Sequence, residues 1–524
     1  MKTVEKANQF ILEEKETINP LFKPKAHLTP EIGWINDPNG FIFFRGEYHL
    51  FYQFNPYESV WGPMHWGHAK SEDLVNWEQL PVALAPDKDY DKDGCFSGSA
   101  IVKDDVLWLM YTGHIVNEDG TVSQVQNMAF STDGIHFEKI EQNPVATADG
   151  LPEEVIANDF RDPKIFEKDG HYYSVVATKH QDNVGCIVLL SSPNLTEWKF
   201  ESIFLKGEAN QGFVWECPDY FEVDGQEYLI ISPMRYQKDG NDFININSNI
   251  FVTGHVDWDR KVFVADSFKE IDHGHDFYAA QTTESPEGER VMVAWMHTWG
   301  RKLVTNDFGH KWYGQMTLPR ILKKNENGLH QVLPTSVLEA FKDIEIGQSI
   351  KGPSKFSLKL EDSLELRLGS DQDYLQFGYD KESQEVYIDR GHLDIAVNDI
   401  DADAVAKCLD GCLCRAVDSS ACIRIKACRR AKVDDVAAVS FKHGRKECTS
   451  DKEEPFDIRI DHLIPVVEVA FVLWFQASCQ SCIIDQDIDV APCLRNIVNS
   501  LASRFSVAHV ESQCQHLDTF LFEF

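Results

Sequence analysis

Three acidic side chains lie beside a proline in three similar segments of the chain. The segments read WINDPNGF, FRDPKIF and WECPDYF. Asp37 and Asp162 directly precede the proline of their copies, and Glu216 lies one residue farther away. Single Asp-Pro pairs are common in turns. Three acids in register within an internal repeat instead indicate a functional group, and clustered carboxyls can work as nucleophile, acid and base.

The proline restricts where these acids can lie in the fold. A proline disfavours helix for the residue before it, and within a sheet it is confined to a strand start, a bulge or an edge. We therefore predict that each segment forms the beginning of a strand.

The repeat extends beyond the three acidic copies. Each copy continues through a glycine-containing turn into an apolar strand, as in a β-hairpin. Two further units share this design without the proline, so that turns fall near residues 46, 104, 169, 225 and 288. A period of roughly 55–65 residues suits four-stranded blades arranged around an axis. We predict an all-β fold with a five-bladed β-propeller over residues 24–335.

A propeller brings equivalent repeat positions together, because the innermost strands of all blades start at one end of the central channel. Three residues of the other two units should join the acids there. The expected cluster contains Asp37, Asp162, Glu216, Phe96, Ser97 and Tyr278.

The segments WINDPNG, FSGS, RDP and WECPD resemble, in order, the signature blocks of glycoside hydrolase family 32, the β-fructofuranosidases. The resemblance covers residues 13–333 and continues more weakly to residue 390. It implies a five-bladed propeller followed by a C-terminal β-sandwich. It also implies cleavage of the β-fructofuranosyl bond of sucrose or sucrose 6-phosphate, with release of fructose. Fructan hydrolysis, fructosyl transfer and a non-catalytic sugar-binding scaffold are the alternatives.

Carried over residue by residue, the resemblance makes Asp37 the nucleophile, Glu216 the general acid and base, and Asp162 the stabiliser of the transition state. A retaining mechanism places nucleophile and acid about 5–5.5 Å apart. Like charges raise the pKa of at least one crowded carboxyl, and we expect Glu216 to hold the proton. Donors such as Asn36 should keep Asp37 ionised. Arg161 should keep Asp162 charged or bind a sugar hydroxyl, unless it only forms a balancing salt bridge.

Amide and aromatic side chains near the acids suit the hydroxyl edges and apolar faces of one hexose. The resemblance to the family implies that the substrate-binding residues are Asn36, Pro38, Asn39, Gln53, Trp61, Phe96, Ser97, Arg161, Tyr278 and Trp295. For the tryptophans the alternative is a place in the propeller core, which we favour for Trp66 only.

No metal and no cofactor are expected. His65 and His68 lie three residues apart, but no acid or cysteine completes a ligand set beside them.

Length and charge narrow the class of protein. A chain of 524 residues suits two domains, and 43% hydrophobic residues can form large cores. A net charge of −34 disfavours binding to nucleic acid and to anionic membranes. A phosphorylated sugar would need local cations, for which Arg235, Arg301 and Lys311 are candidates. The expected partner is a small sugar, and the oligomeric state stays open.

Residues 1–23 have no apolar run typical of a signal peptide, and no segment has the length of a transmembrane helix. We predict a short amphipathic helix there, with Val4, Phe10, Ile11 and Leu12 available for packing. Cytoplasmic location is the expectation, as for the bacterial sucrose-6-phosphate hydrolases of the resembling family.

The second domain is predicted over residues 345–524, with sandwich strands between residues 355 and 390 that alternate apolar and polar residues. Residues 392–524 are atypical, because they hold ten of the 13 cysteines. Disulfides, a metal site and a sequence translated out of frame are the alternatives. We favour the last, since FDIRIDHLIPVVEVAF alone still resembles the family.

Overall fold

The structure is a computed structural model. It describes residues 2–343 apart from 241, 301–302 and 327, and then residues 353–355, 362–369, 374–383, 385–389 and 424–427. Residues 1–427 form one unit. The predictions for the cysteine-rich region therefore lie outside the described residues, except for residues 424–427.

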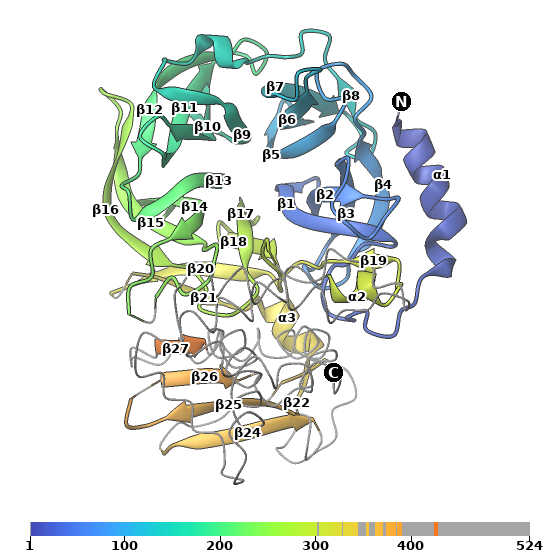
Figure 1. The fold of residues 1–524 in the computed structure, drawn as a ribbon, viewed down its shortest axis with the longest axis vertical. Coiled ribbons are helices and arrows are strands. Elements are labelled where there is room, and N and C mark those ends of the chain that lie inside the picture. Colours follow the sequence, from blue (N-terminus) through green and yellow to red (C-terminus); the bar gives the residue numbers. More distant parts are fainter. Residues whose placement is uncertain are drawn as a thin grey trace, which may run out of the picture. The chain divides into compact units, whose positions relative to one another are not determined.

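Five antiparallel sheets surround a common centre, as the repeat predicts (Figure 1). The first sheet contains β1 (Gly33–Phe44), β2 (Glu47–Asn55), β3 (His65–Ser71) and β4 (Glu78–Leu84). The second contains β5 (Gly94–Lys103), β6 (Val106–Val116), β7 (Val122–Ser131) and β8 (Glu138–Lys139). The third contains β9 (Val155–Lys168), β10 (His171–His180), β11 (Val184–Ser192) and β12 (Lys199–Lys206). In each of these sheets the first strand lies nearest the centre (Figure 1).

The remaining two sheets complete the circle. The fourth contains β13 (Gln211–Val223), β14 (Gln226–Tyr236), β15 (Ile250–Asp257) and β16 (Val262–Glu270). The fifth contains β17 (Tyr278–Glu284), β18 (Arg290–Trp295), β20 (Arg320–Asn325) and β21 (Gly328–Val332). A short strand, β19 (Trp312–Tyr313), pairs parallel with the start of β1 and so joins the chain after the fifth blade to the first. The fold is a five-bladed β-propeller.

Apolar residues fill the spaces between adjacent blades. Trp215 of β13 is fully buried among side chains of the third and fourth blades. A Cβ at Gly185 would lie 2.3 Å from the Trp215 ring, so this glycine makes room for the indole. Burial of a large apolar side chain stabilises a fold by about 1.5–3 kcal/mol. Because such clusters lie between every pair of neighbours, the blades hold one another in place.

The inner strands are interrupted in the same place in every blade. The strand register shifts between Ile35 and Pro38 in β1, and at the corresponding points of β5, β9, β13 and β17. These are β-bulges, which redirect side chains and bend a strand. The predicted strand beginnings are therefore wrong in detail, because β1, β9 and β13 start four to seven residues before their acids, at Gly33, Val155 and Gln211. Of the three positions that proline tolerates, the bulge is the one adopted.

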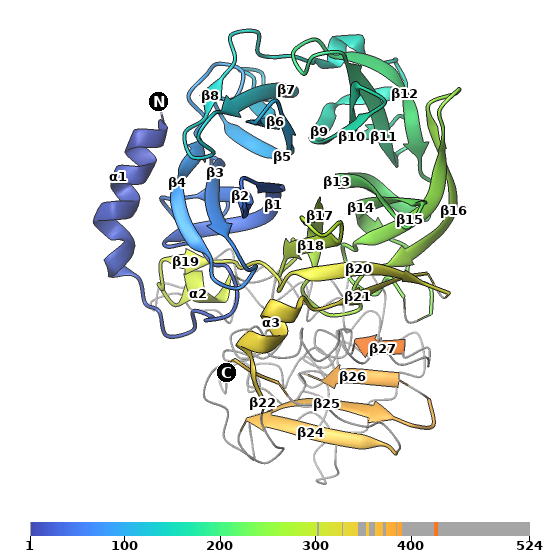
Figure 2. The same cartoon turned by 180° about the vertical axis from the view of Figure 1, so that it is seen from behind.

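Two short helical segments precede the propeller, α1 (Val4–Glu14) and η1 (Lys15–Thr17). The Thr3 hydroxyl caps α1 by accepting the Lys6 N–H at 3.4 Å. Ile11 is buried, but Leu12 is 70% exposed, so the expected packing of Leu12 is wrong. The side chain of Asn8 accepts the Val82 N–H at 2.9 Å. The helix thus covers β4 at the outer edge of the first blade (Figure 2).

The remaining elements are short. The helical ones are η2 (Ala148–Gly150), α2 (Val304–Asp307) and α3 (Thr335–Ala340). The strands after the propeller are β22 (Lys342–Asp343), β23 (Ser354–Lys355), β24 (Leu364–Gly369), β25 (Tyr374–Asp380), β26 (Glu385–Asp389) and β27 (Arg424–Ala427). Strands β24, β25 and β26 pair antiparallel, and β27 joins β26 in parallel. Within the described residues, no helix has the length and apolar character needed to cross a membrane.

Candidate active site

The bulges place three carboxyl groups in one buried cluster. Asp37 lies in the bulge of β1, Asp162 lies in that of β9, and Glu216 is the last paired residue before the bulge of β13. Asp37 and Asp162 are buried, while the Glu216 side chain keeps 14% of its surface exposed. The three strands approach one another only at the centre of the propeller (Figure 1).

Cys217 connects two of the acids. Its Sγ lies 3.5 Å from Asp37 Oδ2 and 3.6 Å from Asp162 Oδ2, so the single thiol proton lies within reach of both oxygens, and its N–H donates to the same Asp162 oxygen at 3.1 Å. Cys217 and Asp162 both have a positive φ, of 45° and 62°. This left-handed conformation is unusual outside glycine. The sequence contained one signal for this residue, since Cys217 stands in the slot that Asp37 and Asp162 occupy in the other copies.

Arg161 and Tyr278 hold Glu216. Arg161 Nη2 donates to Glu216 Oε1 at 3.1 Å, and the Tyr278 hydroxyl donates to Oε2 at 2.7 Å. All three are the last paired residues before the bulges of their strands. Equivalent positions in three consecutive blades therefore form one clasp.

Arg161 contacts three acids and lies closer to Glu216 than to Asp162. Arg161 binds Glu216 and donates to Asp159 at 2.9 Å, whereas Asp162 lies 3.8 Å from its Nε. The Arg161 guanidinium therefore interacts more strongly with Glu216 than with Asp162.

Burial dominates the ionisation of the two aspartates. Burial and then the charge of Glu216 raise the pKa of Asp37 to about 6, against hydrogen bonds from Ser97, Asn36 and Cys217. The Ser97 bond is the short one, at 2.7 Å to Oδ2. Burial also raises the pKa of Asp162 to about 7, although Arg161 opposes the shift. Both carboxyls therefore exchange protons near neutrality, where a catalytic group is most useful.

Two protonated donors support these carboxyls. Burial, reinforced by the neighbouring acids, raises the pKa of the Cys217 thiol and that of the Tyr278 hydroxyl well above their ordinary values. Both groups keep their protons at neutral pH and can donate to carboxylates.

Aromatic side chains of the predicted binding set lie next to this cluster. Trp61 is 48% exposed and its ring lies 6.1 Å from that of half-buried Phe96. Phe96 in turn stacks on His114 at 4.1 Å. An exposed indole of this kind can contact the apolar face of a sugar, as predicted for Trp61, whereas Trp66 is fully buried as expected for core.

Other predicted binding residues form hydrogen bonds or packing contacts with neighbouring residues of the protein. The Gln53 amide donates to the Cys95 carbonyl at 3.0 Å, and Asn36 accepts from Trp34 Nε1 at 2.7 Å. Trp295 is fully buried among Trp34, Tyr278 and Tyr313. Trp295 therefore forms part of the wall behind the site.

Two buried polar atoms in the site are available for a ligand. Asp37 Oδ1 and Asn39 Nδ2 have no hydrogen-bond partner among the described residues. Pro38, which lies between them, pairs with Tyr52 and has no N–H to offer. A buried unpaired acceptor beside a buried unpaired donor fits a ligand that carries hydroxyl groups.

The residues considered as phosphate-binding cations lie in different parts of the molecule. Arg235 is exposed at the end of β14. Lys311 instead binds Thr17 at 2.9 Å and Glu14 at 3.3 Å, so it faces the N-terminal segment. Arg301 lies outside the described residues.

The histidines considered as metal ligands do not form a metal site. His65 contacts the Pro63 carbonyl at 3.0 Å, and His68 contacts His49 at 3.0 Å. Burial lowers the pKa of both imidazoles, so they are neutral core histidines.

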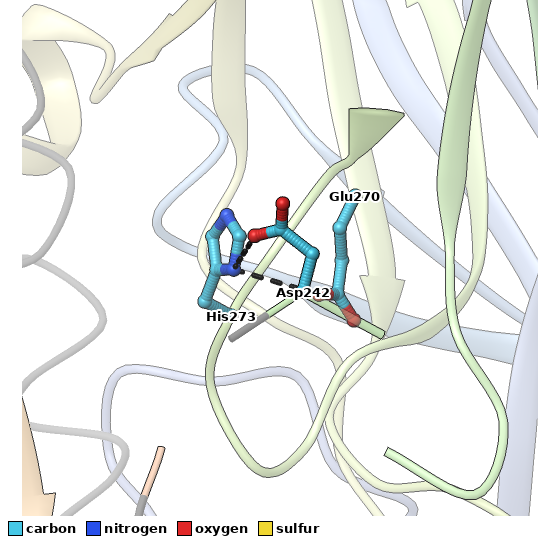
Figure 3. Close-up of side chains that lie close together, drawn as sticks. All are labelled: Asp242, Glu270 and His273. Carbon is cyan, nitrogen blue, oxygen red and sulfur yellow. Dashed lines mark ion pairs between the residues drawn. The ribbon is translucent and has the colours of Figure 1, made fainter. Parts of the chain in front are cut away.

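One cluster of metal-ligand type occurs among the described residues and contains Asp242, Glu270 and His273 (Figure 3). His273 Nδ1 lies 3.5 Å from Glu270 and 3.7 Å from Asp242. Glu270 also accepts the Phe243 N–H at 2.7 Å. These contacts join the connection after β14 to the end of β16, which is a structural role.

Known proteins are similar to this chain in sequence and in fold. The model of the "Glycosyl hydrolases family 32 N-terminal domain" matches residues 27–333. The sucrose-6-phosphate hydrolase of Zymomonas mobilis is 41% identical over 352 residues, which cover 64% of this chain and 66% of that protein. The raffinose invertase of Escherichia coli is 40% identical over 312 residues, covering 59% and 64%. The matched regions thus span slightly less than two thirds of the length of these relatives.

Solved structures agree with the fold. The Bombyx mori GH32 beta-fructofuranosidase superposes with a TM-score of 0.66 and 33% identity, covering 73% of this chain and 83% of that one. The sucrose-6-phosphate hydrolase of Lactobacillus gasseri superposes with a TM-score of 0.62 and 26% identity, covering 72% and 81%.

Proposed function

The chain belongs to glycoside hydrolase family 32, and we propose that it is a retaining β-fructofuranosidase that cleaves sucrose or sucrose 6-phosphate and releases fructose. The observation that carries the proposal is the convergence of Asp37, Asp162 and Glu216 on Cys217 and Arg161. Relatives whose names specify sucrose 6-phosphate or raffinose support the substrate class.

Asp37 is the proposed nucleophile. One of its oxygens accepts from Ser97 and Cys217, and the other has no partner among the described residues. The bound oxygen orients the carboxylate, and the free one can attack the anomeric carbon. The fructosyl group is then held as an ester on Asp37 while the leaving oxygen departs.

Glu216 is the proposed acid and base. Tyr278 and Arg161 orient both of its oxygens. In the first step Glu216 transfers its proton to the leaving oxygen of the glucosyl part. In the second step it removes a proton from water, which cleaves the fructosyl ester.

Asp162 is the proposed stabiliser of the transition state. Its ionised carboxyl lies beside Asp37 through the shared thiol of Cys217. The sugar ring gains positive charge as the bond breaks, and a negative group fixed nearby lowers the barrier. The proposed binding residues lie around the three acids or support them. They are Asn36, Pro38, Asn39, Gln53, Trp61, Phe96, Ser97 and Arg161.

We further propose that the protein acts in the cytoplasm on a small sugar. The net charge of −34 argues against nucleic acid as a partner.

Fructose release from sucrose and from sucrose 6-phosphate tests the function directly. The purified protein should release fructose from at least one of them, and the ratio of kcat/KM identifies the substrate. Inulin and levan serve as fructan controls. Absence of fructose from every one of these substrates would contradict the proposal.

Retention and the roles of the acids have separate tests. With methanol present, a fructosyl ester should yield methyl β-fructofuranoside, detectable by NMR, whereas direct displacement by water would invert the configuration. Asp37→Asn should lower kcat by about 10⁴-fold or more, as expected for loss of a nucleophile. Asp224→Asn, the same change in an exposed turn, should leave kcat unchanged.

A further inference from the structure

A ring of five buried polar side chains lies next to the acids along the inner strands. Each ring residue lies two positions after Asp37 or its counterpart in another blade. The ring residues are Asn39, Ser99, Lys164, Asp219 and Gln281. Two residues along a strand advance about 7 Å and return the side chain to the same face. The ring therefore lies about 7 Å farther along the central channel than the acid cluster.

Each ring residue bonds to a neighbouring blade. The inner strands do not pair with one another in the described part of the chain. Their edge N–H groups therefore need side-chain acceptors. Four ring residues supply them: Asn39 accepts from Gly98 N at 3.2 Å, Ser99 from Ile165 N at 2.8 Å, Asp219 from Thr282 N at 2.8 Å, and Gln281 from Phe41 N at 2.8 Å.

Lys164 completes the ring in a different way. A lysine has no acceptor atom, and Lys164 instead donates to Asp219 at 2.7 Å and to the Thr282 carbonyl at 2.8 Å. The second oxygen of Asp219 accepts the Thr282 hydroxyl at 2.9 Å. The ring thus contains one buried ion pair, and this pair joins the third, fourth and fifth blades.

These three blades carry the clasp around the proposed acid. Lys164 follows Asp162 by two residues, and Asp219 follows Glu216 by three. Thr282 lies four residues after Tyr278 on β17. The ion pair therefore determines how the strands that carry Arg161, Glu216 and Tyr278 lie relative to one another.

We propose that Lys164 and Asp219 are positioning residues, which align Glu216 with the leaving oxygen by holding the inner strands of three blades in register. The proposal rests on the proposed function. A displacement of about 1 Å in a reacting group can reduce the rate by about 10²-fold. A pair that only stabilised the fold would leave the chemistry of the folded enzyme unchanged.

Dependence on the leaving group separates these two roles. Sucrose has a poor leaving group that needs a proton from Glu216, whereas p-nitrophenyl β-D-fructofuranoside has a leaving group that needs little protonation. A misplaced acid therefore slows the first substrate more than the second. Loss of stability alone slows both by the same factor.

The test uses the double variant Lys164→Met/Asp219→Asn, because removing both charges leaves no unpaired buried ion. We expect kcat for sucrose to fall by about tenfold or more, with a change in KM of less than about threefold, and kcat for the nitrophenyl substrate to fall less. The matched control is Arg320→Met/Asp272→Asn, which removes another ion pair of 2.7 Å, between a buried arginine and a partly exposed aspartate outside the inner strands. The control should slow both substrates equally or not at all.

Equal slowing of both substrates by the ring variant, after correction for the folded fraction, would overturn the proposal. If the double variant does not fold, Thr282→Val removes only the hydroxyl donor to Asp219. It should produce a smaller shift in the same direction, and an unchanged ratio of the two rates would again overturn the proposal. Failure of the proposed function is distinguishable, because the unmodified protein would then release no fructose.

Discussion

The acids of the site differ in the atoms that hold them. Asp37 has a hydroxyl and a thiol as donors, whereas Glu216 has a guanidinium and a phenol. Burial nevertheless outweighs the donors of Asp37, since the pKa of this group rises to about 6. The carboxylate is kept reactive rather than merely ionised, because a strongly stabilised carboxylate would be a weak nucleophile.

The first residue-scale prediction concerns the pH dependence. The proposed mechanism requires Asp37 and Asp162 to be ionised, so kcat/KM should fall as the pH drops through the range from about 7 to about 6. Ser97→Ala removes a hydrogen bond that favours ionised Asp37, and the acidic limb should therefore move to higher pH. A bond of about 0.5–1.5 kcal/mol corresponds to a shift of about 0.5–1 pH unit.

The control for this variant is Ser174→Ala. Ser174 is a buried serine whose hydroxyl has no hydrogen-bond partner among the described residues. Its removal should leave the pH profile in place. A shift of the Ser97→Ala profile to lower pH would contradict the assigned contact.

The second residue-scale prediction concerns stability. The pKa of Asp37 lies above its ordinary 3.8 in the folded protein, so ionisation opposes folding as the pH rises from about 4 to about 6. Asp37→Asn removes this effect. The inactive variant should gain about 2–3 kcal/mol in free energy of unfolding at pH 7 and nothing near pH 3.5. Urea titrations at both pH values measure the difference, and a loss of stability at pH 7 would contradict the prediction.

At the scale of elements, the bulged inner strand is the unit that builds the site. The bulge turns a regular strand, whose alternate residues would face opposite sides, into one that presents several consecutive residues to the centre. Asp162, Cys217 and Ala279 adopt positive φ at corresponding points of three strands. Such strain persists only when surrounding structure imposes it, here the packing of adjacent blades.

The element-scale prediction concerns the bulge of β5. A Cβ at Gly98 would lie 2.0 Å from the Met110 carbonyl oxygen on β6. Gly98→Ala must therefore separate the two strands, and it should move Ser97 away from Asp37. We expect a loss of about 1–3 kcal/mol in stability together with a lower kcat. Thermal unfolding and sucrose turnover measure the two effects.

Gly150→Ala provides the comparison for this change. A Cβ at Gly150 meets no atom within 4 Å. The variant should match the unmodified protein in Tm and kcat. If Gly98→Ala were equally harmless, β5 would not control the position of Ser97.

At the scale of the whole molecule, the net charge of −34 acts on charged substrates before they reach the site. Sucrose is neutral and is unaffected, whereas sucrose 6-phosphate is repelled. Salt screens this repulsion over about 10 Å at 0.1 M. The kcat/KM for sucrose 6-phosphate should therefore rise by about twofold or more between low and physiological salt.

Sucrose serves as the internal control of this experiment, because its kcat/KM should not change with salt. A decrease for sucrose 6-phosphate would instead show that local cations, such as Arg235, dominate the approach of the phosphate. The sign of the salt effect thus reports whether the net charge or local cations dominate the approach of sucrose 6-phosphate.

Much of the architecture could be predicted from local sequence patterns. The five turns, the apolar strands and the proline motifs are short-range features, and they were sufficient to predict five blades and to select Asp37, Asp162 and Glu216. The amphipathic segment near the N-terminus likewise indicated α1. Turn chemistry and hydrophobic periodicity depend on neighbouring residues, so a sequence alone determines them.

Only the tertiary structure decided which atoms meet. The thiol of Cys217 between two acids, the burial of Trp295 and the ion pair of Lys164 with Asp219 join residues of different blades. Such contacts depend on strand register and on where each bulge falls. A shift of one residue would turn every side chain to the opposite face. The place of the acids in the repeat was enough to identify them from the sequence. Their hydrogen-bond and packing partners depend on how the five blades pack around one centre.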